Sequence, residues 1–146
     1  MGKGNTFSND LLKLIFNATA IANIADNAVS GPLTNLGVSL HTSSPGAGGN
    51  QTTNEAAYPS YARVSVARTT GGWTAASSQS TSPVANIDFP TSTGSPSETE
   101  THFAVGTDTS NGTGKILYSG TVTPNITMNA AGITPRLTTA STITEA

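Results

Sequence analysis

The stretch Leu36-Gly37-Val38-Ser39-Leu40-His41 decides the fold, because apolar residues alternate in it with small or polar ones. Successive side chains of a β-strand point to opposite faces of a sheet, so this period of two predicts a strand with one face in the core. Shorter patterns of the same kind, bounded by turn residues, recur at residues 61–68, 84–89, 101–106, 115–122, 125–128 and 137–144. The chain is therefore expected to be all-β, a single-domain β-sandwich or jelly roll.

A short N-terminal helix is expected ahead of the strands. Ser8 is a suitable N-cap, and Phe7 can pack against Leu12 at the start of this helix. Its apolar face contains Leu11, Leu14, Ile15 and Ala18, and Leu12 and Phe16 widen this face to more than half of the circumference. The helix is then either a lid on the core of the sandwich or an arm that docks on a neighbouring protein.

One domain overall is expected for a chain of 146 residues. Residues 1–31 would form the helix and an arm, because Ser30-Gly31-Pro32 stops the helical composition, and residues 32–146 would form the β-sandwich. The segments rich in Ser, Thr and Gly between the strands are interpreted as loops within this domain.

The chain is poor in charge. Thr and Ser account for 42 residues, whereas Lys, Arg, Asp and Glu together account for 14, which predicts uncharged β faces that other protein can cover at a low desolvation cost. The net charge of −2 and the scattered basic residues argue against a nucleic-acid partner. No apolar run reaches the roughly 18 residues that a bilayer span requires, so no membrane partner is expected.

The residues that could carry chemistry form no recognisable active site. The sequence has no Gly-x-Ser-x-Gly elbow, and without Cys it has no thiolate zinc site and no cysteine nucleophile. His41 and His102 could meet in space, but two histidines lack the further ligand that a metal site needs. Glu98 and Glu100 are expected to solubilise a loop, with ordinary pKa values. The sequence therefore predicts a protein that is not an enzyme and that has no cofactor and no metal.

Aromatic and basic residues cluster in one part of the sequence. Tyr58, Tyr61 and Trp73 lie near Arg63, and Tyr, Trp and Arg are the residue types enriched at interface hot spots. Tyr61 and Arg63 fall on the strand face opposite Val64, so they are expected to point away from the core. Trp73 alternatively fills one end of the sandwich.

A set of short motifs follows in order along residues 7–145. They are Phe7-Ser8-Asn9, Leu40-His41-Thr42 before Pro45-Gly46, Tyr61-Ala62-Arg63-Val64, Gly71-Gly72-Trp73-Thr74, Ile87-Asp88-Phe89-Pro90, Thr101-His102-Phe103, Gly114-Lys115-Ile116-Leu117-Tyr118-Ser119-Gly120 and Gly132-Ile133-Thr134-Pro135. In this order the chain resembles a family of small virion proteins of tailed bacteriophages that are often labelled tail-fibre-like. It is also similar to the capsid cement or decoration proteins of podovirus-type phages.

The resemblance implies a structural virion protein, a jelly roll that binds the outer surface of the phage head as cement and bridges major capsid subunits. It implies the major capsid protein and further copies of the same chain as partners, in a homo-oligomer that is assembled in the host bacterial cytoplasm. A phage tail or fibre-attachment protein is the alternative of the same origin. A carbohydrate-binding β-sandwich module, with an aromatic platform, is the alternative of another class.

The residues expected to contact a partner are apolar positions at the helix and aromatic or basic positions of the β part. They are Phe7, Leu12, Ile15, Phe16, His41, Tyr58, Tyr61 and Arg63.

Overall fold

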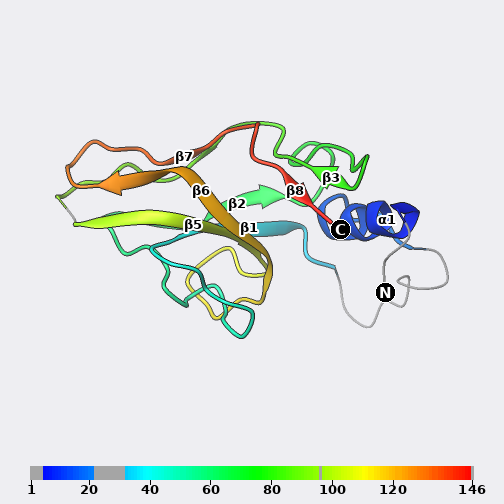
Figure 1. The fold of residues 1–146 in the computed structure, drawn as a ribbon, viewed down its shortest axis with the longest axis horizontal. Helices are drawn as coiled ribbons and strands as arrows, with labels where there is room; N and C mark the ends of the chain where they lie inside the picture. Colours follow the sequence, from blue (N-terminus) through cyan, green and yellow to red (C-terminus); the bar gives the residue numbers. More distant parts are fainter. Residues whose placement is uncertain (1–4, 22–31, 96, 146) are drawn as a thin grey trace. The chain divides into compact units, whose positions relative to one another are not determined.

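The computed structural model describes residues 5–21, 32–95 and 97–145 (Figure 1). In this part of the chain, helix α1 (Asn5–Phe16) precedes eight strands. They are β1 (Asn35–His41), β2 (Val64–Ala67), β3 (Ser80–Thr81), β4 (Ile87–Asp88), β5 (Glu98–Gly106), β6 (Ile116–Met128), β7 (Arg136–Leu137) and β8 (Ile143–Thr144). This order confirms the expected all-β class with one short N-terminal helix. No helix in the described ranges is long and apolar enough to cross a membrane.

The described strands form three sheets. The largest has the order β2-β1-β5-β6, and the other two pair β3 with β8 and β4 with β7. β1 and β5 are antiparallel, with Leu40 opposite Phe103 and His41 opposite His102. β5 and β6 are antiparallel as well, with register shifts on either side of residues 102–105. β6 ends the strand order and is therefore an edge strand.

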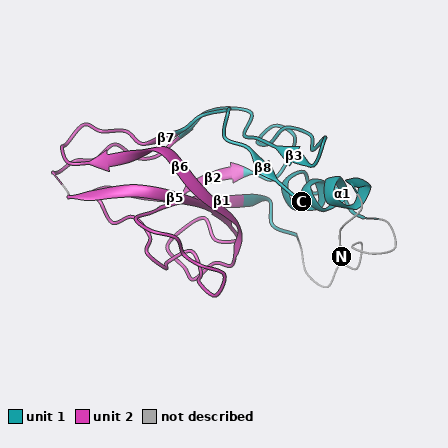
Figure 2. Ribbon diagram, viewed as in Figure 1, with its two compact units in different colours: residues 1–35, 67–87, 137–146 teal, residues 36–66, 88–136 magenta. Residues whose placement is uncertain are grey.

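The chain divides into two compact units, each made of segments that are separate in sequence (Figure 2). Unit 1 combines residues 1–35, 67–87 and 137–146, and unit 2 combines residues 36–66 and 88–136.

In unit 1, an aromatic pair and an arginine hold helix α1. Phe16 is buried, and the centroid of its ring lies 4.7 Å from that of Trp73 in an edge-to-face arrangement. Arg68 donates hydrogen bonds to the carbonyl oxygens of Leu14 and Ile15, the second with an Nε–O distance of 2.6 Å. These carbonyl groups at the end of a helix lack partners within the helix, and a cation there is favourable. The helix is thus packed into unit 1.

The N-terminus of α1 differs from the expected one. The helix begins at Asn5, so Ser8 lies inside the helix and is buried, with a hydroxyl that has no hydrogen-bond partner. Ser8 lies one turn before the buried Leu12, and the burial of this shared face overrides the preference of Ser for the N-cap. The residue before β3 is bound to the same helix, where Asn9 Oδ1 accepts a hydrogen bond from the N–H of Gln79 at 2.6 Å.

Some expected strands are shorter in the structure. β2 begins at Val64, so residues 61–63 lie outside it. The strand expected over residues 84–89 is reduced to β4, and Val84 is 47% exposed. Alternation overestimates the strands here because β-branched residues favour a strand only where a neighbouring strand and a buried face are available.

One expected break between strands is absent. The strands expected over residues 115–122 and 125–128 are a single strand, β6, which continues through Pro124. Pro has no N–H to donate and is tolerated in an edge strand, which is the position of β6 in the sheet.

Both faces of β1 are buried, although the sequence indicates one polar face. Ser39 and His41 on the second face are fully buried. His41 Nδ1 lies 2.9 Å from the carbonyl oxygen of Thr53. A Cβ added to Gly37 would lie 1.9 Å from the carbonyl oxygen of Asp108. Loops that follow β1 and β5 therefore cover the face that was expected to be polar and exposed.

Replacing Phe16 tests the packing of unit 1. Phe16→Ala is expected to lower the free energy of unfolding by about 3–5 kcal/mol, because it leaves a cavity beside Trp73. Trp73 is the single Trp of the chain, so its fluorescence during urea unfolding reports the change. Phe7→Ala is the matched control, since Phe7 is 42% exposed on the same helix and its loss is expected to change the midpoint little. Equal losses in the two variants would contradict this account.

Candidate functional site

A buried ion cluster in unit 2 is built around Arg63, whose side chain is 0% exposed. Its guanidinium binds the carboxylate of Glu55 through two hydrogen bonds, Nε to Oε1 at 2.7 Å and Nη2 to Oε2 at 2.8 Å. A third hydrogen bond joins Nη1 to Oδ1 of Asp108 at 3.0 Å. Bidentate pairing suits a buried guanidinium because it satisfies donors that burial removes from water. We call Glu55, Arg63 and Asp108 the Arg63 cluster.

Neighbouring groups hold the Arg63 cluster in its charged form. The hydrogen bonds that Arg63 donates to Glu55 are the main cause that raises the pKa of Arg63. The N–H groups of Ser110 and Gly112 donate to Asp108 Oδ1 at 2.8 and 3.1 Å, and these bonds, followed by Arg63, lower the pKa of Asp108. Two carboxylates around one guanidinium give the cluster a net charge of about −1.

Tyr61 joins the Arg63 cluster to the sheet. Its hydroxyl donates a hydrogen bond to Glu55 Oε1 at 2.9 Å and accepts one from the N–H of Leu40 in β1 at 3.1 Å. Burial, followed by the charge of Glu55, raises the pKa of Tyr61. The hydroxyl therefore stays protonated and continues to donate to Glu55.

The buried amide of Gln51 fixes the loop that follows β5. Its Oε1 accepts the N–H of Asp108 at 2.9 Å, and its Nε2 donates to the carbonyl oxygens of Gly37 and Asp108, each at 3.2 Å. A Cβ on Gly106 would lie 2.3 Å from Cδ of Gln51, and a Cβ on Gly114 would lie 2.1 Å from its Oε1. Both glycines therefore make room for this side chain.

His41 is occupied by hydrogen bonds within the protein. Nδ1 lies 2.9 Å from the carbonyl oxygen of Thr53, which can only accept, so Nδ1 carries the proton. Nε2 lies 2.9 Å from Oγ of Ser39. Burial is the main cause that lowers the pKa of His41, which favours the neutral ring. Because both ring nitrogens are bound in this way, His41 has no nitrogen available to bind a metal ion. Among residues 5–21, 32–95 and 97–145, no group of three or more His, Asp or Glu side chains could hold a metal ion.

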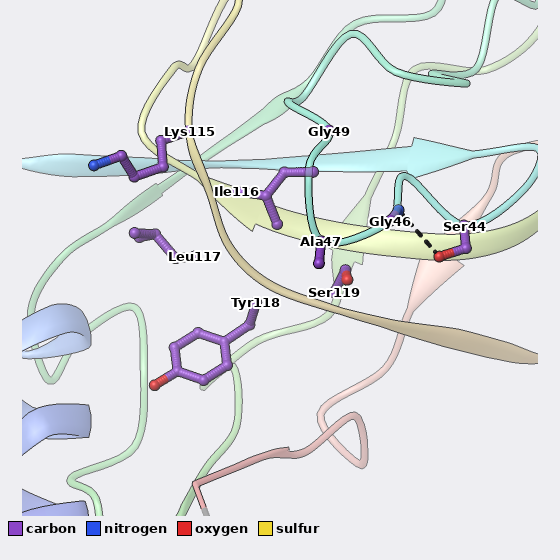
Figure 3. A pocket seen from close by; sticks show the side chains of 9 residues that line it. All are labelled: Ser44, Gly46, Ala47, Gly49, Lys115, Ile116, Leu117, Tyr118 and Ser119. Atoms are coloured by element: carbon purple, nitrogen blue, oxygen red, sulfur yellow. Dashed lines mark hydrogen bonds between the residues drawn. The ribbon is translucent and has the colours of Figure 1, made fainter.

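The loop after β1 and the first part of β6 enclose a pocket of about 580 Å³ (Figure 3). Its lining residues are small, apolar or hydroxylic apart from one lysine: Ser44, Gly46, Ala47, Gly49, Lys115, Ile116, Leu117, Tyr118 and Ser119. In this view the amine of Lys115 and the hydroxyl of Tyr118 point away from Ala47. Consecutive residues of a strand point to opposite faces, so a lining by residues 115–119 means that the pocket follows the main chain of β6.

The residues expected to contact a partner are divided between the units and are mostly buried. Phe7 is exposed and Ile15 and Tyr61 are half-buried, whereas the remaining five are buried: Leu12, Phe16, His41, Tyr58 and Arg63. The aromatic platform of a sugar-binding module is not formed by Trp73, Tyr58 and Tyr61, since Trp73 and Tyr58 are only 1% and 2% exposed. Contacts of the eight residues with a partner stay a prediction.

The expectation that Tyr61 and Arg63 point away from the core is wrong. Both lie before β2, where the alternation of a strand does not apply, and the intervening Ala62 is exposed while Arg63 is buried. The carboxylates of Glu55 and Asp108 explain the burial, because they compensate the charge of the guanidinium in the interior.

The expectation that Glu98 and Glu100 solubilise a loop with ordinary pKa values is wrong for Glu100. Glu100 lies in β5 and is fully buried, and neither of its carboxylate oxygens has a hydrogen-bond partner. Burial, followed by the charge of Glu98, raises the pKa of Glu100 to about 8. Glu98 itself is half-buried, and its Oε1 accepts the N–H of Ala57 at 3.0 Å. Glu100 is therefore mainly protonated at neutral pH.

Reasoning from the sequence missed Glu55, Asp108 and Gln51, which hold the loops of unit 2. Asp108 lies among Asn, Ser and Gly residues that are typical of a turn, and Gln51 carries no signal of its own. A partial signal was available in the glycines, since Gly106 and Gly114 flank the loop that Gln51 binds. The distance along the chain between Arg63 and Asp108 hides their pairing.

The buried charged and amide groups of unit 2 hold its loops on a sheet. Over residues 2–144 the chain matches the family model described as podophage GP4 fiber I protein gp80, and it belongs to this family. A search of curated proteins gives no match. The expected membership of a phage virion protein family is thus confirmed, and the family is related to fibres. The family description does not mention capsid decoration.

The Arg63 cluster can be tested against an exposed ion pair. Arg63→Met is expected to lower the free energy of unfolding by roughly 3 kcal/mol, because it leaves the carboxylate of Glu55 buried without a counter-charge. Arg136→Met is the matched control, since Arg136 pairs with Asp88 while both side chains are about half exposed, and little change is expected. Urea unfolding of both variants measures the difference. Similar midpoints would show that the Arg63 cluster does not stabilise the fold.

Glu100 is expected to make stability depend on pH. The folded protein keeps the proton up to a pH of about 8, whereas the unfolded chain releases it in the usual glutamate range, so stability falls as the pH rises between these values. Melting temperatures measured across this interval should fall for the wild type and change less for Glu100→Gln. Parallel pH profiles for the two proteins would exclude Glu100 as the cause.

Proposed function

We propose that this protein is a structural subunit of a podophage tail fibre and has no enzymatic role. The observation that carries the proposal is the family match, which extends over residues 2–144 and bears the description of a fiber protein. A match of this extent supports a role for the whole chain rather than for one short motif.

The buried polar groups of unit 2 support a structural role. Arg63 and Gln51 direct their hydrogen bonds to other groups of the protein, and both ring nitrogens of His41 do the same. Groups bound in this way stiffen the loops after β1 and β5. They contribute rigidity, which a subunit of a virion needs, and not a reactive group.

The capsid cement role expected from the sequence is the second candidate. The order of motifs and the low charge favour it, because uncharged β faces can cover capsid subunits at a low desolvation cost. The same surface suits a fibre subunit, and the family description favours the fibre. Under our proposal the partners are further copies of this chain and other tail proteins, rather than the major capsid protein.

The number of copies in purified virions separates the two roles. A fibre subunit is expected in a small multiple of the rotational symmetry of the tail, whereas a cement protein is expected in hundreds of copies. Quantitative mass spectrometry with isotope-labelled peptides of this chain and of the major capsid protein gives the ratio. Gold-labelled antibodies give the position, which should be the tail. Gold spread over the head, with a ratio near one copy per capsid subunit, would overturn the fibre proposal.

A further inference from the structure

The loop after β5 contains the one Asn-Gly dipeptide of the sequence, Asn111-Gly112. Asn111 is exposed and Gly112 is half-buried. In such a dipeptide the side-chain amide of Asn can reach the next main-chain nitrogen, and Gly has no side chain that would obstruct a reaction between them. The reaction removes the amide nitrogen of Asn, so this dipeptide is a chemically reactive position in unit 2.

The reaction at Asn111 needs no co-reactant other than water. The main-chain nitrogen of Gly112 loses its proton and attacks Cγ of Asn111, a bond forms between these two atoms, and the bond from Cγ to Nδ2 breaks. Nδ2 leaves as ammonia with the proton that the nitrogen of Gly112 has lost. Water then opens the cyclic imide at either of its carbonyl groups. The product is an aspartate or an isoaspartate, and both carry a new carboxylate.

Asp108 binds the nitrogen that would attack Asn111. The N–H of Gly112 donates a hydrogen bond to Asp108 Oδ1 at 3.1 Å, and the same oxygen accepts bonds from the N–H of Ser110 at 2.8 Å and from Nη1 of Arg63 at 3.0 Å. A hydrogen bond to the protonated form of a group disfavours the loss of its proton, and so does a neighbouring negative charge. The carboxylate of Asp108 therefore keeps the proton on the nitrogen of Gly112.

We propose that Asn111 is a site of spontaneous deamidation and that Asp108 slows the reaction by binding the N–H of Gly112. Groups outside the loop hold Asp108 in place, since Arg63 binds its carboxylate and Gln51 accepts its N–H. The Arg63 cluster thus protects an exposed residue from a chemical change, in addition to holding the loop. The inference goes beyond the fibre role and does not depend on where in the virion the protein lies.

Deamidation of Asn111 would in turn weaken the contacts of Asp108. In an isoaspartate the main chain runs through the side-chain carbon, so an additional atom lies between Ser110 and Gly112. Both residues donate their N–H to Asp108 Oδ1, and the additional atom changes the spacing of these two donors. The chain belongs to a family of phage virion proteins, and the proteins of an assembled particle are not replaced. A slow reaction at this position therefore accumulates with the age of the particle.

Peptide mapping by mass spectrometry measures the rate of the reaction in the purified full-length protein. In urea that unfolds the chain, Asn111 is expected to react faster than Asn125, which is also exposed but is followed by the β-branched Ile126. In buffer the rate at Asn111 is expected to be lower by at least about tenfold, the factor that corresponds to one hydrogen bond to a charged group. Equal rates at Asn111 in buffer and in urea, or a rate in urea no higher than that of Asn125, would contradict the proposal.

Two variants of the Arg63 cluster separate the bond to Gly112 from the general stability of the loop. Asp108→Ala removes this bond and is expected to raise the rate at Asn111 in buffer by about tenfold. Glu55→Gln is the matched control, because it removes the other carboxylate of the cluster and leaves Asp108 in place to bind Gly112, so its rate should equal that of the wild type. Circular dichroism verifies that each variant is folded, and the comparison of buffer with urea tests the wild type without any substitution. An unchanged rate in folded Asp108→Ala, or an equal rise in both variants, would refute the control by Asp108.

Discussion

The burial of the Arg63 guanidinium is the constraint on which the loops of unit 2 depend. A guanidinium in the interior is tolerated only when its donors are paired, and the partners of Arg63 come from two different loops. Glu55 lies in the loop after β1, and Asp108 lies in the loop after β5. Arg63 therefore joins the two loops, because each supplies a carboxylate that accepts hydrogen bonds from its guanidinium. Gln51 strengthens this dependence through its bonds to Asp108.

The other two arginines also bind groups of the protein itself. Arg68 binds carbonyl oxygens at the end of α1, and Arg136 pairs with Asp88. The chain has six Lys and Arg residues in all, so three of them already serve contacts within its own units. Few cations are left for ion pairs with a partner. Small uncharged polar side chains, by contrast, are abundant in this sequence.

The sequence predicts what depends on neighbouring residues and misses what depends on distant ones. The alternation at β1 and the apolar face of α1 are local patterns, and the structure contains both elements. The pairing of Arg63 with Asp108 joins residues 45 positions apart, and no periodicity records it. The strand pattern was also extended across residues 61–63, which reversed the expected direction of Tyr61 and Arg63. Glu100 was misjudged for the same reason, because polar neighbours in sequence gave no sign of its burial in β5.

The small number of charged residues has one consequence in the interior of unit 2 and another at the edge strand β6. In the interior of unit 2, the few charges are compensated and hold loops in place. On β6 the absence of charge removes a common protection of a sheet edge against other strands. Pro124, which has no N–H to donate to a further strand, protects its own part of this edge instead.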